Sequence, residues 1–379
     1  MPISVDSYDA LAGQVLELYG EAERVMCERV ARRLQRGVTE PGWTERKLAE
    51  TQAMSRELTS LVDGLQGQRQ GMTDRFVRDA YAASSQAFVS DATRFARAAG
   101  IESLSPNSVK VINILADMNN CLNAADRAIL RRADDAYADV IGRASALMAT
   151  GTITSREAVQ SALDQFANRG IGSFVDRAGR TWDMATYAEM AALTAIERAT
   201  IAGYVDTMRE YGFDLAQISS HHGACPLCEA WEGVVVSVSG ETRGYPTLDE
   251  AEGAGCFHPR CLHTISTYYG DLSGPARREP RDVAEPSAGY SARTEQRAAE
   301  RAERLWKRRM AVACSPEAER RAYARVRMYQ ERIRRLIGDY NAGTDAETDR
   351  LSRKWYREGG RVRLSEAARR LKPFKIATQ

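Results

Sequence analysis

The chain has 379 residues, more than one ordinary domain needs, and its 44% hydrophobic and 27% charged content is typical of folded proteins with buried cores. No run reaches the ~18 to 20 apolar residues that cross a bilayer, and the start, MPISVDSYDAL, lacks the basic and then apolar pattern of a secretion signal. These features argue against a membrane-spanning or secreted protein, and we expect one that is assembled in a cytoplasm. Only 8 Phe and 5 Trp accompany abundant Ala, Arg and Glu, which favours a mainly α-helical class.

The net charge of +2 conceals an uneven distribution. Residues 291–379 carry 24 Lys and Arg against 12 Asp and Glu, a net +12, whereas residues 1–290 carry 29 against 39, a net −10. A basic segment beside an acidic body indicates contact with nucleic acid or with an acidic protein surface. The alternative is a solvated helical face whose charge serves only solubility.

Residues 1–150 contain four long segments with apolar residues at helical spacing. They run from Asp6 to Arg36, from Thr44 to Leu65, from Thr73 to Ala99 and from Val109 to Met148. Long amphipathic helices joined by short loops pack side by side, so the pattern predicts an N-terminal domain that is an elongated long-helix bundle.

Residues 151–212 are predicted to form a connector of helices and a hairpin. Helical spacing covers Ser155–Phe166 and Met184–Tyr211. Between them, Gly170–Trp182 has the glycines and the apolar residues of a small β-hairpin.

Residues 213–270 lack helical spacing, and their pattern predicts a small β-rich module that packs on the helices. Three short runs resemble strands, at Asp214–Ser219, Val234–Val238 and Thr264–Tyr269. The runs flank the sequence HHGACPLC and the sequence CFHPRCLH, which hold most of the chemically distinctive residues of the chain.

The C-terminal part divides into a linker and a basic helical tail. Residues 271–290 hold three prolines with Gly and charge, which is typical of a linker. The tail, residues 291–379, is predicted to contain two very basic helices and two shorter ones, at Ser291–Arg309, Pro316–Ile337, Glu347–Arg357 and Ser365–Leu371.

All four histidines and four of the seven cysteines of the chain lie between residues 221 and 263. Cys225 and Cys228 form one pair, and His258 and Cys261 form a second pair with the same spacing. Zn²⁺ prefers four thiolate or imidazole ligands at about 2.0 to 2.3 Å, and two tight turns brought together supply that geometry without a large core. We therefore expect a closed structural zinc site of these four residues that staples a loop-rich segment.

Two further residues are spare candidates for this site. Cys256 and His263 flank the second pair, and the spacing leaves open an exchange of Cys256 for His258. A redox pair at Cys225 and Cys228 would normally follow a strand in a βαβ unit, which the surrounding sequence lacks. A structural disulfide stays open, although four cysteines gathered with four histidines are more simply interpreted as metal ligands.

A metal-dependent nuclease is the alternative function. His221, His222 and His258 could hold a catalytic cation or act as a base, but no carboxylate cluster accompanies them in the sequence. The chain also lacks a phosphate-binding loop, a dinucleotide-binding glycine motif and a nucleophile elbow. We therefore expect that the protein is not an enzyme.

The motifs between residues 174 and 263 resemble those of the phage minor capsid protein 2 family, which is related to the Mu F-type head morphogenesis proteins. The resemblance rests on their joint order: Phe174-Val175-Asp176, Gly179-Arg180, Trp182, Tyr187-Ala188-Glu189-Met190, Tyr211-Gly212, Asp214-Leu215, Ile218-Ser219-Ser220-His221, Gly223-Ala224-Cys225-Pro226, Cys228, Trp231, Gly233, Val235, Ser239-Gly240, Tyr245-Pro246, Leu248, Phe257-His258-Pro259, Cys261 and His263.

The resemblance implies a structural protein of the virion, without a known reaction. It implies a place inside the capsid near the portal vertex, with the phage portal protein and other capsid or scaffold proteins as partners. We therefore also expect several copies to be arranged around the portal, and the basic tail to bind packaged double-stranded DNA.

Overall fold

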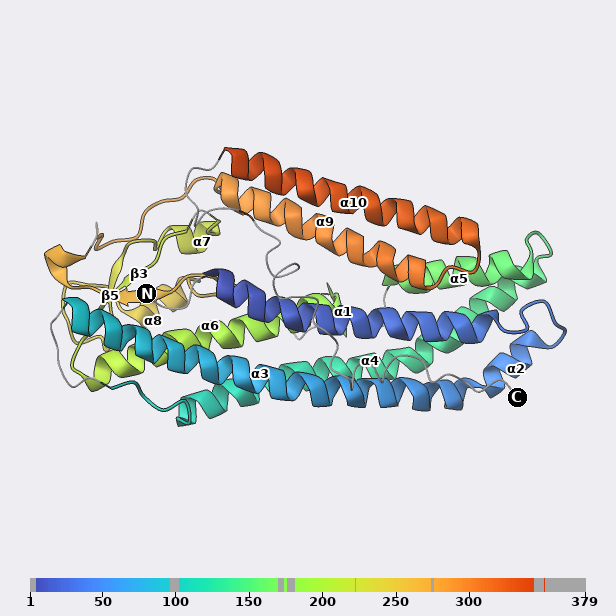
Figure 1. Ribbon diagram of the computed structural model, residues 1–379, viewed down its shortest axis with the longest axis horizontal. Helices are drawn as coiled ribbons and strands as arrows, with labels where there is room; N and C mark the ends of the chain where they lie inside the picture. The colour runs from blue at the N-terminus through green and yellow to red at the C-terminus, as the bar shows by residue number, and fades with distance from the viewer. Residues whose placement is uncertain are drawn as a thin grey trace.

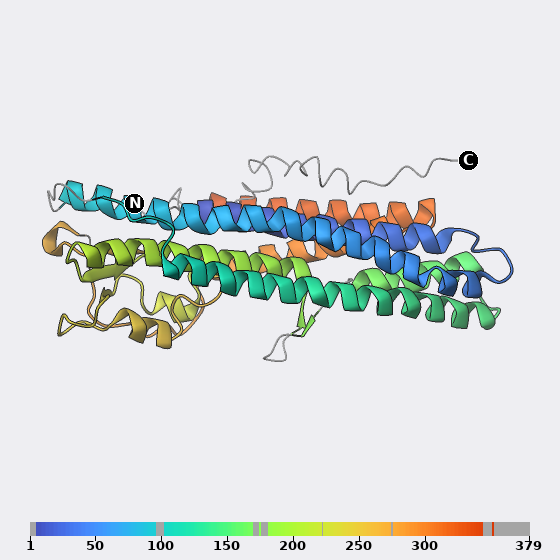
Figure 2. The ribbon, with the colours of Figure 1, turned by 90° about the horizontal axis from the view of Figure 1, so that it is seen from below.

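The computed structural model describes residues 5–95, 102–169, 174–175, 181–221, 223–273, 276–343 and 351. The described chain is mainly α-helical, and its long helices lie along one axis in an elongated bundle (Figures 1 and 2). The long helices are α1 (Val5–Gln35), α3 (Thr51–Phe95), α4 (Val109–Ala149), α5 (Ser155–Arg169) and α6 (Met184–Glu210), and the short α2 (Trp43–Ala49) lies between α1 and α3 in the chain. The predicted fold class is confirmed. Among the described helices, none is both long and apolar enough to cross a membrane.

Helix α3 is longer than the sequence pattern predicts. The pattern gave separate helices over Thr44–Leu65 and Thr73–Ala99, but α3 is one helix of 45 residues, about 67 Å long, that includes Gly67 and Gly71. Each glycine costs about 1 kcal/mol relative to alanine in a helix interior. Arg69, between the two glycines, is only 2% exposed and points into the bundle, so tertiary contacts keep this stretch helical.

Arg69 joins three helices through one buried polar network. Its Nη2 lies 2.9 Å from Oδ2 of Asp126 on α4, and the Asp126 side chain is fully buried. The Tyr19 hydroxyl of α1 donates to Oδ1 of the same carboxylate at 2.9 Å. Because each charged group has its partners, the network fixes the register of α1, α3 and α4.

Helix α6 packs closely on α3 because its facing residues are small. A Cβ atom at Gly203 would lie 2.3 Å from the carbonyl oxygen of Tyr81, so only glycine fits there. Alanines line much of the rest of the buried face of α6: Ala185, Ala188, Ala191, Ala192, Ala195 and Ala199. The main core therefore runs continuously between α1, α3, α4 and α6.

A small β-rich module caps one end of the bundle. Its antiparallel sheet has the order β4 (Val235–Ser237), β3 (Leu215–Ile218), β5 (Ile265–Thr267), with Ala216 opposite both Val236 and Thr267. A second core, which includes Phe88 of α3 and Tyr204 of α6, packs under this sheet. The predicted hairpin is also present, with β1 (Phe174–Val175) antiparallel to β2 (Thr181–Trp182).

The predicted tail begins as an antiparallel hairpin of α9 (Ala288–Ala311) and α10 (Pro316–Ala342), which lies against α1 and α5 (Figure 1). Arg308 of α9 is buried, and its Nη1 lies 2.9 Å from Oε2 of Glu23 and 3.2 Å from Oδ2 of Asp183. Part of the basic charge of α9 is thus neutralised inside the protein. The shorter basic helices predicted at Glu347–Arg357 and Ser365–Leu371 lie outside the described residues.

The described residues of the predicted linker are hydrogen-bonded to the β-rich module. Arg277 makes two backbone hydrogen bonds of 2.8 Å, to Gly233 and Val235, and Arg281 makes one to Ala230. The Arg277 side chain also donates to the Ala230 carbonyl oxygen at 2.9 Å. These bonds tie the approach to α9 to the module.

Breaking the Arg69 network should destabilise the whole bundle. Asp126→Asn leaves the buried guanidinium without its counter-charge, so the free energy of unfolding should fall by about 3 to 5 kcal/mol, measured by urea denaturation. Arg334→Gln, in an exposed pair with Glu331, serves as the control and should cause no measurable change. Equal stability of the two variants would contradict the role given to Arg69.

Candidate metal centre

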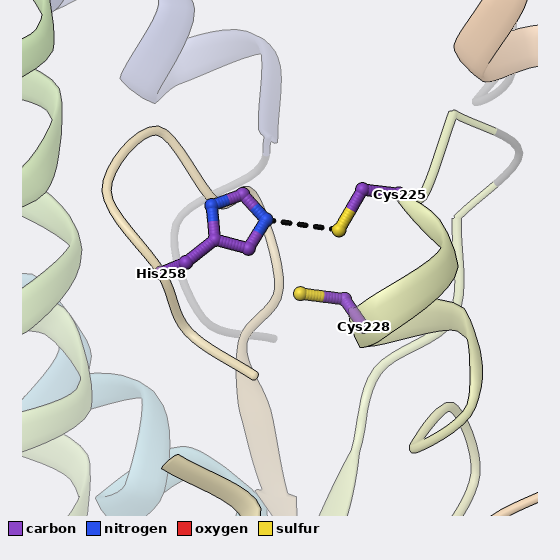
Figure 3. A group of neighbouring side chains, drawn as sticks. All are labelled: Cys225, Cys228 and His258. Atoms are coloured by element: carbon purple, nitrogen blue, oxygen red, sulfur yellow. Dashed lines mark hydrogen bonds between the residues drawn. The ribbon is translucent and has the colours of Figure 1, made fainter. Parts of the chain in front are cut away.

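The first pair of candidate ligands is held by a short helix, α7 (Pro226–Glu229). Cys225 is its N-cap residue in an extended conformation, and Pro226 occupies the first helical position, where its fixed φ suits the helix. Both sulfur atoms of the pair point across to His258 on the opposite loop (Figure 3). The Sγ of Cys225 lies 2.9 Å from Nε2 of His258.

The second pair lies on a tight and strained loop. Phe257 and Arg260 have positive φ angles of 56° and 72°, a conformation that costs non-glycine residues about 1 to 3 kcal/mol each. The Cys261 amide donates to the His258 carbonyl oxygen at 2.9 Å and closes the turn. Arg260 donates to Glu189 of α6 at 2.9 Å, so the bundle helps to hold the strained loop in place.

The candidate ligands gather around Cys228. Among the described residues they form two groups of three, Cys225–Cys228–His258 and Cys228–Cys261–His263, and the ligand atoms of each group all lie within 4.8 Å of one another. The Sγ atoms of Cys228 and Cys261 are 3.6 Å apart. The four predicted zinc ligands are therefore neighbours, but Cys261 pairs with the spare candidate His263 rather than completing the group of His258.

The other candidates lie close by. Cys256 is 2% exposed and within hydrogen-bonding reach of Cys228. The His221 ring contacts that of His263 with centroids 4.3 Å apart and a tilt of 41°, and burial lowers the pKa of His221 to about 3. His221 is thus neutral at pH 7 and orients its neighbour. His222 lies outside the described residues.

Both histidines of the two groups have their outer ring nitrogen engaged. His258 Nδ1 donates to the Pro259 carbonyl oxygen at 2.9 Å, which leaves Nε2 facing Cys225. His263 Nε2 lies 3.1 Å from Oε1 of Glu232, and its Nδ1 is 3.3 Å from the Cys261 sulfur. A carbonyl or carboxylate partner of this kind fixes the tautomer of metal-binding histidines.

The neighbouring thiols favour the thiolate form of Cys228. Hydrogen bonds from Cys225, Cys256 and Cys261 hold the pKa of Cys228 well below its usual value. Hydrogen bonding to Cys228 conversely raises the pKa of Cys225 and of Cys261. The centre thus contains one sulfur that ionises first, which is the form that binds a metal.

A buried carboxyl group approaches the centre from the bundle. Glu197 of α6 is 2% exposed, and burial raises its pKa well above the usual value. Among the residues that the structure describes, neither of its oxygens has a hydrogen-bond partner of normal geometry, although the Cys261 thiol lies close by. A carboxyl group left in this state is costly unless a proton or a cation compensates it.

The two groups differ in their access to solvent. Cys225 and His258 are half-buried, and the members of both groups line one groove of about 460 Å³ together with Arg293 and Arg297 of α9. All three members of the other group are buried. Soft sulfur and imidazole ligands in this arrangement suit Zn²⁺.

Sequence reasoning missed Glu197, Glu232 and the Arg260–Glu189 pair. Glu197 and Glu189 lie on α6, far from the cluster in sequence, and nothing in their helical pattern distinguishes them from surface carboxylates. Glu232 follows the first cysteine pair closely, but only the fold shows that it faces His263.

Comparison with known proteins identifies the family to which the chain belongs. Residues 4–338 match the family model of phage minor capsid protein 2. A protein described as a structural protein of Lactococcus phage LL-H is 27% identical over 234 residues, which cover 59% of this chain and 61% of that relative. No solved structure matches significantly. Because the matched region covers most of the chain, including the bundle and the β-rich module, the chain belongs to the phage minor capsid protein 2 family.

Proposed function

We propose that this protein is a structural component of a tailed-phage head, bound to the portal vertex inside the capsid and in contact with packaged DNA. The supporting observation is the family match over residues 4–338, which spans the bundle, the module, α9 and most of α10. The elongated bundle offers long side surfaces to a ring-shaped partner, and the arginine-rich α10 lies on its outside (Figure 1). A zinc ion in the module keeps the loops rigid.

The nuclease alternative has weaker support. It rests on His221, His222 and His258; both ring nitrogens of His258 are engaged, Nδ1 by the Pro259 carbonyl oxygen and Nε2 by the Cys225 sulfur, and His221 Nδ1 accepts from the Gly223 amide. These groups are placed to orient one another rather than to reach a DNA strand. Incubation of the purified protein with plasmid DNA and Mg²⁺, Mn²⁺ or Zn²⁺ separates the two functions, because histidine-dependent cutting would favour the enzyme.

Portal binding is tested directly by co-expression with the portal protein of the same phage. We expect the two proteins to co-purify through affinity capture and size-exclusion chromatography. Intact portal rings that elute without this chain would contradict the portal part of the proposal and leave the DNA part standing.

The DNA contact is assigned to the outer face of α10. Its buried side chains, Ala318, Ala322, Val326 and Ile333, form one stripe of the helix, and the contacts of α10 are mainly with α9. Outside this stripe, α10 exposes seven arginines and four acidic residues: Arg320, Arg321, Arg325, Arg327, Arg332, Arg334, Arg335, Glu317, Glu319, Glu331 and Asp339. The excess of arginines suits the phosphate backbone.

Removing arginines from this face should weaken DNA binding in a salt-dependent way. Replacing Arg321, Arg327, Arg332 and Arg335 with Gln should lower the affinity for double-stranded DNA, and the slope of log K against log salt should fall by about 0.9 per lost phosphate contact, measured by fluorescence anisotropy. The matched control replaces four exposed arginines of other helices, Arg56, Arg75, Arg127 and Arg156. Equal losses in both variants would show that only net charge matters.

Removing the central sulfur should release the metal and loosen the module. Cys228→Ser should lose bound zinc and expose residues 213–270 to limited proteolysis, while far-UV circular dichroism of the bundle changes little. Cys121→Ser, a half-buried cysteine of α4, is the matched control and should retain zinc. Full zinc retention by Cys228→Ser would exclude the proposed site.

A further inference from the structure

A second groove lies on the surface where α5, the end of α9 and the first half of α10 meet (Figure 1). It has a volume of about 570 Å³. Its apolar lining consists of Trp306 of α9 and of four residues of α10: Ala318, Ala322, Ala324 and Met328. Because Met328 is 41% exposed and Trp306 is half-buried, this apolar surface is open to solvent.

The rim of this groove is positively charged. Among the described residues that line it, one is acidic, Asp164 of α5, and three are arginines: Arg309, Arg321 and Arg325. The guanidinium carbons of Arg309 and Arg325 lie 4.5 Å and 5.6 Å from the centre of the Trp306 ring. Stacking on an aromatic ring holds a guanidinium in place while its N–H edge can still bind a carboxylate. The groove therefore suits a partner that brings both an apolar side chain and carboxylates.

DNA is a poor match for the floor of this groove. Phosphates are bound through charge and hydrogen bonds, and they gain nothing from a floor of alanine, methionine and tryptophan. Tryptophan, methionine and arginine are instead enriched at the centres of protein–protein interfaces. The composition of the groove thus favours a protein surface as its occupant.

The β-rich module of the same chain carries a surface of the complementary kind. Leu227 of α7 is 56% exposed, and a Cβ atom at Gly255 would lie 3.2 Å from its Cδ1. Gly255 follows the short acidic helix α8 (Leu248–Gly253) by two residues. This helix exposes three carboxylates: Asp249, Glu250 and Glu252. Residues 239–255 together contain four acidic residues and one arginine, so an exposed leucine lies beside an acidic surface.

One copy of the protein cannot bring these two surfaces together. The groove lies toward the end of the molecule that contains α5, whereas α7 and α8 belong to the module at the opposite end (Figure 1). A second copy can supply the acidic surface that the groove of the first copy suits. Because the two surfaces are different, such an interface leaves one of each unused in a pair and can add further copies.

We propose that copies of this chain associate head to tail, with Leu227 and α8 of one copy bound in the groove of the next. Leu227 packs on the apolar floor beside Trp306, and the carboxylates of α8 pair with the arginines of the rim, among them Arg309 and Arg325. This inference goes beyond the proposed function, because the interface requires neither the portal protein nor DNA nor zinc.

The test is the oligomeric state of the purified full-length protein without portal protein or DNA. Sedimentation velocity over a range of concentrations should show self-association that weakens as salt is added, because charged pairs form the rim of the interface. Leu227→Ser should weaken the association at least about tenfold, since it removes the apolar anchor. Leu272→Ser is the matched control, because this leucine is 67% exposed and belongs to neither surface, and it should have no effect.

Charge reversal gives a second measurement that does not depend on Leu227. Arg325→Glu and Asp249→Arg should each weaken self-association at least about tenfold, because like charges then face one another. An equimolar mixture of these two variants should associate again, since each supplies the surface that the other lacks. Arg332→Glu, at an exposed arginine of α10 outside the groove, is the matched control and should associate as the wild type does.

Three results would overturn the head-to-tail interface. They are a wild-type protein that stays monomeric at every concentration, even one that captures a different acidic protein, self-association that survives both charge reversals, and a mixture of the two variants that remains monomeric. Arg325 is not among the arginines replaced to test the DNA contact, so each of these results leaves the portal, DNA and zinc proposals to their own experiments.

Discussion

The close contact of α6 with α3 joins the bundle core to the core under the sheet. It depends on the absence of a side chain at Gly203, because any Cβ atom there would collide with the Tyr81 backbone. Further along the same two helices, Phe88 of α3 and Tyr204 of α6 belong to the second core, which lies under the sheet, and their ring centroids are 5.5 Å apart. The Tyr204 hydroxyl accepts from the Thr267 amide at 3.0 Å and donates to Asp91 at 3.0 Å, so the same helices that form the bundle also position the module.

Periodicity predicted the mainly helical class and the small sheet because both depend on local patterns of apolar residues. Periodicity did not predict that α3 is one continuous helix, because Gly67 and Gly71 resemble a helix break in the sequence. The buried Arg69–Asp126 pair, which the sequence pattern does not reveal, helps to keep this stretch helical. The cysteine and histidine pairs were recognisable from spacing alone. Glu197 was not, because its importance comes from the helix crossing that brings α6 beside Cys261.

The charge count predicted a basic C-terminal segment, but it could not show which arginines are buried and which are exposed. On α9, Arg308 is buried against Glu23 and Asp183, and Arg304 donates to Thr186 at 3.0 Å. These arginines fasten the hairpin to the bundle and are not available to a polyanion. Most exposed arginines of the hairpin belong to α10. The two helices are similar in composition, but the arginines of α9 mainly hold the hairpin on the bundle. Deleting the whole basic segment would therefore also remove part of the fold.

The α9–α10 hairpin and the Cys/His cluster are in contact at the start of α9. A Cβ atom at Gly223 would lie 2.4 Å from Nε of Arg293, so the loop before Cys225 touches α9 directly. The preceding segment is held to the module by the backbone bonds of Arg277. A change in the order of the cysteine- and histidine-bearing loops would therefore reach the beginning of α9, while Arg308 anchors its other end. The Cys/His cluster thus lies next to the start of the basic hairpin, while the packing of α9 on α1 and α5 holds the hairpin on the bundle.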